Sequence, residues 1–238
     1  VARFPFDKFS DASNELGTQM KATGEVMSIG RTIEEGILKA VRSLETGVCH
    51  IHNKKFDDWS TDSLLEYIRK GTDDRMHAIA QLIRKGVDLL IIYNHTKIDM
   101  LFLEKLKNIV EMEKVVAENK GCIATLKEAK KMGFSDKYIG QLWGMSEAEM
   151  FELRKKEGVF PVYKIIDSCA GEIDTYVPYF YSTYEAENES VRSDRKKILV
   201  LGSGPIRIGQ GVEFDYSTVH AIWTIREAGY EAIIINNN

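Results

Sequence analysis

Glycines at short intervals divide the middle of this 238-residue chain, and their spacing is the strongest constraint on its fold. Each segment between them carries apolar side chains at helical spacing, and a glycine follows where a left-handed residue would end a helix. The predicted helices span 62–70, 73–85, 98–119, 125–132, 136–143 and 147–157, and the glycines are Gly71, Gly86, Gly121, Gly133, Gly144 and Gly158. Short helices joined by brief turns predict an all-α unit with its own core.

Three patterns mark helix starts: Thr32-x-x-Glu35, Thr125-x-x-Glu128 and Ser146-x-x-Glu149. In each, the hydroxyl can accept a hydrogen bond from a free backbone N–H while the glutamate reaches back, as in a capping box. Apolar residues recur at helical spacing from Ile33 to Leu44, and Gly47 supplies a stop, so a short amphipathic helix is expected there. The stretch before it is too short to form a core alone.

The end of the chain has a different pattern. A charged linker over 185–197 leads into an apolar, β-branched run over 197–201, then a glycine-rich loop, a helix over about 216–228 and a second apolar run over 231–235. This order predicts two parallel strands with a helical crossover, a βαβ unit. Two aromatic stretches, 162–166 and 175–181, have no helical period, and we expect them to lie over the helices or lead back to a neighbouring sheet. The fold predicted is therefore mainly α, with a central all-helical bundle and a partial α/β unit.

The glycine-rich loop is the first chemical candidate, because glycines after a strand let backbone N–H groups approach a phosphate. A dinucleotide fingerprint needs glycine where Arg207 stands and an acid where Asn236 stands, and a P-loop needs lysine where Gln210 stands. We therefore favour tight turns over an independent nucleotide site. Glu213 and Asp215 remain polar groups near the carboxyl end of a strand, where open α/β sheets place their sites.

Other candidate residues are isolated. The run Cys49-His50-Ile51-His52 has no second ligand pair at a regular distance, so a polar linker is favoured over a metal site. The three cysteines, Cys49, Cys122 and Cys169, are too far apart in sequence to form a disulfide framework, which indicates a reducing compartment such as the cytoplasm. His77, His95 and His220 are single histidines without a recognisable nucleophile.

Nucleic acid and membrane are excluded as main partners by charge and hydropathy. The helices between 125 and 157 resemble a helix-turn-helix reader of DNA. The second helix, however, would present the acids at 147, 149 and 152 to the DNA phosphates, which repel them. The net charge of −4 also disfavours phosphate binding. The aromatic run from Tyr176 to Tyr184 is flanked by acids, which favours a sealed interface over base stacking. No apolar run reaches the roughly 18 residues that cross a bilayer, and the N-terminus lacks the features of a signal peptide.

Four motifs, in order along the chain, resemble the large subunits of the carbamoyl phosphate synthetase family. They are Gly17–Met27 (GTQMKATGEVM), Pro161–Lys164 (PVYK), Tyr179–Glu185 (YFYSTYE) and Gly202–Tyr216 (GSGPIRIGQGVEFDY). This resemblance implies a helical oligomerisation domain between two homologous ATP-grasp halves. By it, 1–45 is the tail of the first half, 46–191 the oligomerisation domain and 192–238 the opening βαβ (pre-ATP-grasp) unit of the second half. The missing Met and the end at Asn238 then suggest a piece of a longer protein.

The resemblance also implies an activity. The family's ligase makes carbamoyl phosphate from bicarbonate, glutamine-derived ammonia and two ATP, for arginine and pyrimidine biosynthesis, and a glutaminase small subunit or domain is its partner. By the alignment, ATP and Mg²⁺ (or Mn²⁺) are held outside this chain, so we expect no catalytic, cofactor or metal residue here and no activity from this piece alone.

Three residues match the loop that lines the family's carbamate passage: Arg207, Gly211 and Glu213. Ser203 and Ile206 depart from the usual pattern, so the lining is expected to differ in detail. The role expected for the chain is to link the two synthetase halves and to self-associate. The alternatives are a helix-turn-helix DNA-binding regulator and a free-standing nucleotide enzyme.

Overall fold

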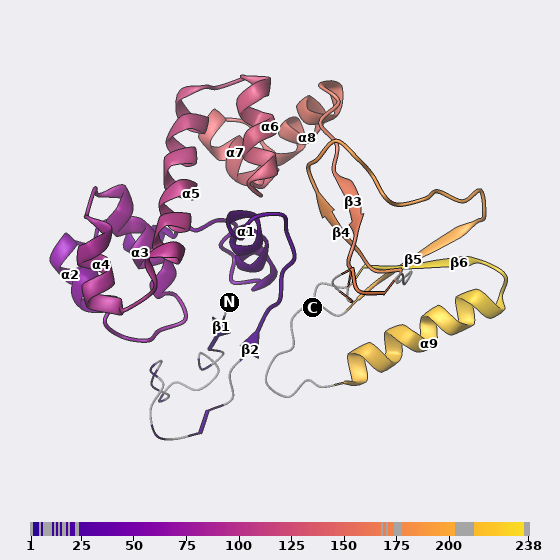
Figure 1. Ribbon diagram of the computed structural model, residues 1–238, viewed down its shortest axis with the longest axis horizontal. Helices are drawn as coiled ribbons and strands as arrows, with labels where there is room; N and C mark the ends of the chain where they lie inside the picture. The colour runs from indigo at the N-terminus through magenta and orange to yellow at the C-terminus, as the bar shows by residue number, and fades with distance from the viewer. Residues whose placement is uncertain are drawn as a thin grey trace.

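A computed structural model describes residues 2–4, 6, 11, 13, 15, 18, 20–21, 24–167, 169, 171–173, 178–202 and 212–235. Helices dominate this part of the chain, as predicted (Figure 1). The helices are α1 (Ile33–Ser43), α2 (Thr61–Tyr67), α3 (Arg75–Arg84), α4 (Leu89–Thr96), α5 (Met100–Glu118), α6 (Ile123–Lys131), α7 (Asp136–Trp143), α8 (Glu147–Lys156) and α9 (Glu213–Glu227). The strands are β1 (Ala2–Arg3), β2 (Gly24–Glu25), β3 (Val162–Ile165), β4 (Phe180–Thr183), β5 (Lys197–Leu201) and β6 (Glu231–Ile235).

Helix α5 is the centre of the helical core. It packs against α1, α3, α4, α6 and α7, and Figure 1 shows it running between the α2–α4 group and the α6–α8 group. Its buried apolar residues recur at helical spacing, from Leu103 and Leu106 to Ile109 and Val116. One continuous cluster contains side chains from α1 through α8, including Leu38 of α1. The helix nearest the N-terminus therefore shares its core with the later helices.

Most predicted helices are confirmed, with differences at their ends. Helix α7 has the predicted bounds, and α8 is one residue shorter than expected. Helix α2 already ends at Tyr67, and Gly71 is not among the left-handed glycines, so its predicted role as a helix stop is wrong. The other five glycines assigned to helix ends in the bundle do have a positive φ. Helix α4 was not predicted, because its first five residues are all apolar or aromatic and show no helical period.

The three helix-start patterns behave differently. The Ser146 pattern is a full capping box, because Ser146 Oγ accepts from Glu149 N and the Glu149 carboxylate accepts from Ser146 N. In the Thr32 pattern, the hydroxyl accepts from Glu35 N at 3.2 Å, but the Glu35 carboxylate accepts from Arg31 N, one residue earlier. The Thr125 prediction is wrong. Helix α6 starts at Ile123 with Cys122 as its N-cap, which places Thr125 inside the helix.

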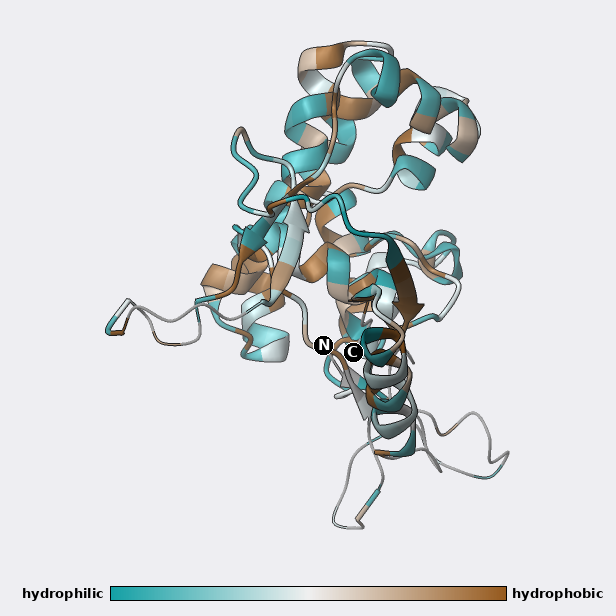
Figure 2. Cartoon of the chain, turned by 90° about the vertical axis from the view of Figure 1, so that its right-hand side faces the viewer, coloured by the Kyte–Doolittle hydropathy of each residue, from teal (hydrophilic) through white to brown (hydrophobic). Residues whose placement is uncertain are grey.

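Among the described residues, the strands form three two-stranded sheets. Strands β3 and β4 pair antiparallel with each other, so this region forms its own small sheet and joins no neighbouring one among the described residues. Strands β5 and β6 pair in parallel over the two predicted ranges, and α9 packs on both, which confirms the βαβ unit. In Figure 2, which faces this side of the molecule, a strand beside α9 is brown and α9 alternates between teal and brown. No described side chain after Thr183 is buried.

Candidate functional site: the junction around β3 and β4

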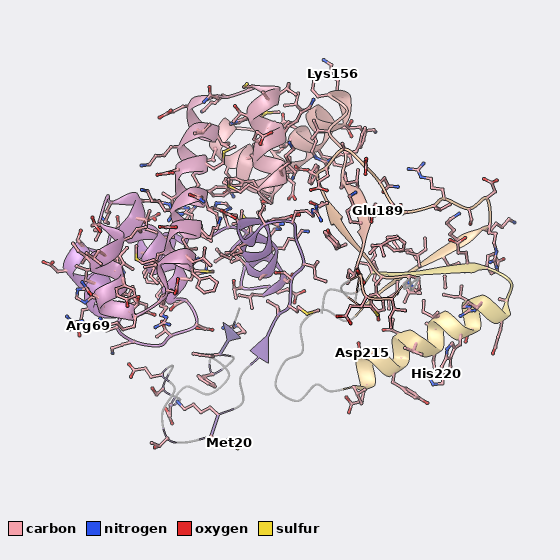
Figure 3. The ribbon with its side chains drawn as sticks, viewed as in Figure 1. Met20, Arg69, Lys156, Glu189, Asp215 and His220 are labelled. Atoms are coloured by element: carbon pink, nitrogen blue, oxygen red, sulfur yellow. The ribbon has the colours of Figure 1, made fainter. Side chains whose placement is uncertain are left out.

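Of the three residues expected to line a passage, only Glu213 is among those that the structure describes. Arg207 and Gly211 lie outside the described residues, as do Ser203, Ile206 and Gln210 of the same loop. Glu213 is the first residue of α9, and its side chain is exposed. Asp215 lies in the same first turn and is also exposed (Figure 3). Their role as a lining therefore stays a prediction.

The Cys49–His52 run separates in space instead of converging on one point. His50 is buried, stacks on the Tyr138 ring with centroids 3.7 Å apart, and places Nε2 2.9 Å from Glu113 Oε1. His52 turns outward, and its Nε2 lies 2.8 Å from Asp57 Oδ1. Across the described residues, no group of three or more His, Cys, Asp or Glu side chains is arranged to hold a metal ion. The His50 side chain is therefore a packing element of the core.

The carboxylate of Glu113 holds a buried charge network together. Arg84 donates to both of its oxygens at 2.7 Å, a bidentate pair. Burial opposes ionisation of Glu113, but the hydrogen bonds from Arg84 and His50 outweigh it and lower its pKa to about 2. Burial lowers the pKa of His50 to about 4, against the raising effect of Glu113, so His50 is neutral at pH 7. The net result is one buried anion facing one cation.

Tyr184, which directly follows β4, ties the β3–β4 pair to helices α6–α8. Two cations lie over its ring, with Lys130 Nζ 4.9 Å and Arg154 Cζ 5.7 Å from the ring centroid. Both cations also reach Asp136, at 2.8 Å from Lys130 Nζ and 3.0 Å from Arg154 Nε. Burial lowers the pKa of Lys130 to about 8 and raises that of Tyr184 to about 12. This contact supports the interpretation that the aromatic run seals an interface.

Helix α1 contacts the same pair of strands from another side. Lys39 Nζ donates to the backbone oxygens of Ile29 at 2.8 Å and Ser182 at 2.5 Å. Arg31 Nε donates to Glu185 Oε1 at 2.9 Å. The Arg31 and Glu185 side chains are half-exposed, so that ion pair adds little stability by itself and mainly fixes position.

The segment after β4 returns along β3. Glu189 accepts from Ile165 N at 2.7 Å and from Lys164 Nζ at 3.0 Å, and Asn188 Oδ1 accepts from Tyr163 N at 2.8 Å. Figure 3 labels Glu189 beside the two strands. These side chains occupy backbone donors of β3 on the edge away from β4, where an unpaired strand would otherwise invite association. Strand β3 and the segment that follows β4 are thus held together at several points.

A surface cavity of about 420 Å³ lies where these contacts meet. It is lined by Arg31, Thr32, Lys131, Lys164, Thr183, Tyr184, Glu185, Ala186 and Glu187. The start of α1, the end of α6, β3 and the segment after β4 each contribute to its wall. Its charged side chains already pair with neighbours, such as Lys164 with Glu189. The cavity therefore lies where several elements contact one another, and its lining residues do not form a recognisable catalytic group.

Sequence reasoning anticipated only part of this junction. The aromatic run indicated an interface, and Tyr181 and Tyr184 do contact cations of the helices. The cations themselves, Lys39, Lys130 and Arg154, lie on three helices far apart in sequence and carry no motif. A lysine or arginine on an otherwise apolar helix face was the one available signal, and it appears in α6 and α8.

The DNA-binding alternative finds no support in the structure. Helices α7 and α8 do pack against each other, but the exposed N-terminal half of α8 carries Glu147, Glu149 and Glu152. Backbone phosphates dominate affinity for DNA, and three carboxylates oppose such contact. Within the described residues, no helix is long and apolar enough to cross a membrane.

Two family models match the chain, one on each side of the junction. Residues 25–158 match the oligomerisation domain of the carbamoyl-phosphate synthetase large chain, and this match covers more than half of the chain. Residues 194–238 match the preATP-grasp domain of carbamoyl phosphate synthase. The first match contains α1 through α8, and the second contains the βαβ unit. Strands β3 and β4 lie between the two matches.

Proposed function

The chain belongs to the carbamoyl-phosphate synthetase large-chain family, and from that premise we propose that its own role is to join the two synthetase halves and to hold copies of the chain together. The family is that of a ligase. One observation carries the proposal: a helical unit of oligomerisation-domain type continues, through an anchored junction, into a preATP-grasp βαβ unit. A segment with this arrangement leads from one domain directly into the next along the chain.

The division of the chain belongs to the same proposal. Residues 1–45 end the first synthetase half, 46–191 form the helical oligomerisation domain, and 192–238 open the second half. The packing of Leu38 and Val41 in the helical core supports a firm connection at the first boundary. The Tyr184, Lys39 and Glu189 contacts fix the β3–β4 pair, which precedes the second boundary. Several weak contacts on different helices constrain orientation better than one strong contact, because each blocks a different rotation.

We propose the chemistry of the whole enzyme from what membership of this family implies. The enzyme would form carbamoyl phosphate from bicarbonate, ammonia and two ATP for arginine and pyrimidine biosynthesis in the cytoplasm, with a glutaminase subunit or domain as partner. ATP and Mg²⁺ or Mn²⁺ would be bound by other parts of it. No group of described residues fits a metal ion, so no step is assigned to one in this chain. Arg207, Gly211 and Glu213 are proposed to line the passage for carbamate.

Two measurements on the 238-residue chain test the proposal. In gel filtration coupled to light scattering, we expect a mass above that of one 27.1 kDa chain at micromolar concentration. In an assay with ATP, bicarbonate and ammonia, we expect no carbamoyl phosphate. A strictly monomeric chain would contradict the assembly role, and turnover would contradict the view that ATP is bound elsewhere. Binding of duplex DNA by the chain at low salt would instead support the alternative of a DNA-binding regulator.

A further inference from the structure

Lys130 of helix α6 is a lysine with almost no access to solvent. It is 5% exposed, although lysine is among the residues that are rarely buried. Its Nζ donates to the Phe134 backbone oxygen and to Asp136 Oδ1, each at 2.8 Å, and lies 4.9 Å from the centroid of the Tyr184 ring. The charge of this amine is therefore decided by the protein groups around it rather than by water.

More positive than negative charge is gathered around this amine. Arg154 of α8 binds the same carboxylate, with Nε 3.0 Å from Asp136 Oδ2. Arg42 of α1 donates to the backbone oxygen of Gly133, in the turn that follows α6, at 2.7 Å. Both arginines oppose a third positive charge at Lys130, whereas Asp136 favours it. Three cations thus lie near one carboxylate, and this imbalance disfavours the charged form of the lysine.

Other titratable groups nearby do not remove the imbalance. Glu35 of α1 lies at the turn after α6, but its carboxylate pairs with Lys39 Nζ at 2.8 Å. The strand side presents the phenols of Tyr163 and Tyr184, and burial raises the pKa of Tyr184 to about 12. An arginine does not lose its proton in a protein, whereas a buried lysine can. Lys130 is therefore the group that yields, and burial, the largest effect on it, lowers its pKa to about 8.

Tyr184 is the part of this cluster that comes from the strand side. It directly follows β4, whereas Lys130, Asp136 and Arg154 belong to α6, α7 and α8. We propose that docking of the β3–β4 pair on these helices is coupled to the loss of one proton from Lys130. The ammonium group gives the proton to solvent when Tyr184 covers it, and the amine takes one back when the strands move away. Such a coupling makes the junction sensitive to pH, which goes beyond the proposed joining role and does not depend on self-association.

The direction of the effect follows from the two states of the lysine. A lysine in water has a pKa of 10.5, and that of Lys130 beneath the docked strands is about 8. Between these two values the undocked chain holds more protons, so raising the pH from 8 toward 10.5 shifts the equilibrium toward docked strands. Below pH 8 the lysine is charged in both states, and docking then carries the cost of burying that charge. The junction is therefore expected to tighten as the pH rises through this range.

An NMR titration of the whole chain, labelled with ¹³C at lysine Cε, measures the coupling directly. The Lys130 signal is the one that Lys130→Arg removes. We expect its midpoint near pH 8 in the unmodified chain, and at least about one pH unit higher in Tyr184→Ala, where water reaches the amine. Tyr181→Ala is the matched control, because the Tyr181 ring instead lies beneath Lys39 Nζ, 5.6 Å from its centroid. It should leave the Lys130 midpoint within about 0.3 pH unit.

Urea unfolding gives an independent measure. Tyr184 lies outside the apolar core cluster, so Tyr184→Ala retains the helical core. The factor by which it raises the equilibrium constant of unfolding should grow at least about three-fold from pH 7 to pH 9, and should stay constant when both chains carry Lys130→Met. A Lys130 midpoint above about pH 10, or one that Tyr184→Ala leaves unchanged, would overturn the proposal. A midpoint lowered by Tyr184→Ala would also overturn it, because the ring's attraction for a cation would then be holding the proton in place.

Discussion

At the scale of single residues, the most informative group is the Glu113 carboxylate. It is nearly inaccessible to solvent, and it stays charged because Arg84 donates a hydrogen bond to each of its oxygens. Removing one partner of such a pair leaves a buried charge without compensation, which costs far more than the loss of an exposed ion pair. The chain therefore depends on ionisation at this one position.

This dependence predicts how stability changes with pH. In the unfolded chain, the Glu113 carboxyl takes up a proton as pH falls below its ordinary pKa of 4.5. In the folded chain, its pKa is about 2, so it takes up the proton only near pH 2. The stability that Glu113 contributes is therefore present above pH 4.5 and is lost as pH falls toward 2; in full it is about 3 kcal/mol. We expect Glu113→Gln to be less stable by about that amount at pH 7, and the gap to shrink by about half or more at pH 3.

Urea unfolding at several pH values measures this gap. Glu111→Gln serves as the control on the same helix, because Glu111 is exposed and its pair with Lys107 is long, at 3.6 Å. It should stay within about 0.5 kcal/mol of the unmodified chain at every pH. A Glu113→Gln gap that does not change between pH 7 and pH 3 would show that the carboxylate is not the group responsible.

At the scale of elements, the close contact between helix α7 and the turn before α8 depends on a glycine. Gly140 lies inside α7, where alanine would ordinarily be the better helix former by about 1 kcal/mol. A Cβ at this position would meet the backbone oxygen of Met145 at 2.6 Å, which is too close for backbone to accommodate. We expect Gly140→Ala to destabilise the chain by about 1–3 kcal/mol, as overpacked sites do.

Gly36 provides the matched comparison. It also lies inside a helix, α1, but a Cβ there would have only Ser28 Oγ nearby, at 3.7 Å. Gly36→Ala should therefore stabilise by up to about 1 kcal/mol. Thermal unfolding followed by circular dichroism compares the two. If both substitutions stabilise, the contact between α7 and the turn before α8 is too loose to require a glycine.

How far the elements could be predicted depended on the pattern each one carries. The bounds of α7, β5 and β6 followed directly from an apolar stripe or run next to a stop signal. Helix α4 was missed because five apolar residues in a row have no period. The Thr125 cap was misplaced because the same motif occurs inside a helix. The junction was foreseen only through its aromatic residues, since the partners of Tyr184 come together by tertiary packing.

At the scale of the whole molecule, burial is distributed unevenly. The fully buried apolar side chains gather in α1–α8, whereas Leu201 is 75% exposed and Trp223 53% exposed in the βαβ unit. Two strands and one helix with no buried side chain among the described residues gain little from the hydrophobic effect. The two parts are therefore expected to differ in local stability even though they are covalently continuous.

Hydrogen exchange on the whole chain measures this difference. Local opening depends on the number of buried contacts, so amides of β5 and β6 should exchange at least about a hundred-fold faster than those in the middle of α5. A chain ending at residue 193 should unfold within about 2 °C of the full chain, because the removed unit adds little to the cooperative core. Equal protection in β6 and α5, or a large drop on truncation, would show that the βαβ unit is stabilised by the helical part. In the expected outcome, the helical unit unfolds as one cooperative core, and the βαβ unit opens locally without affecting it.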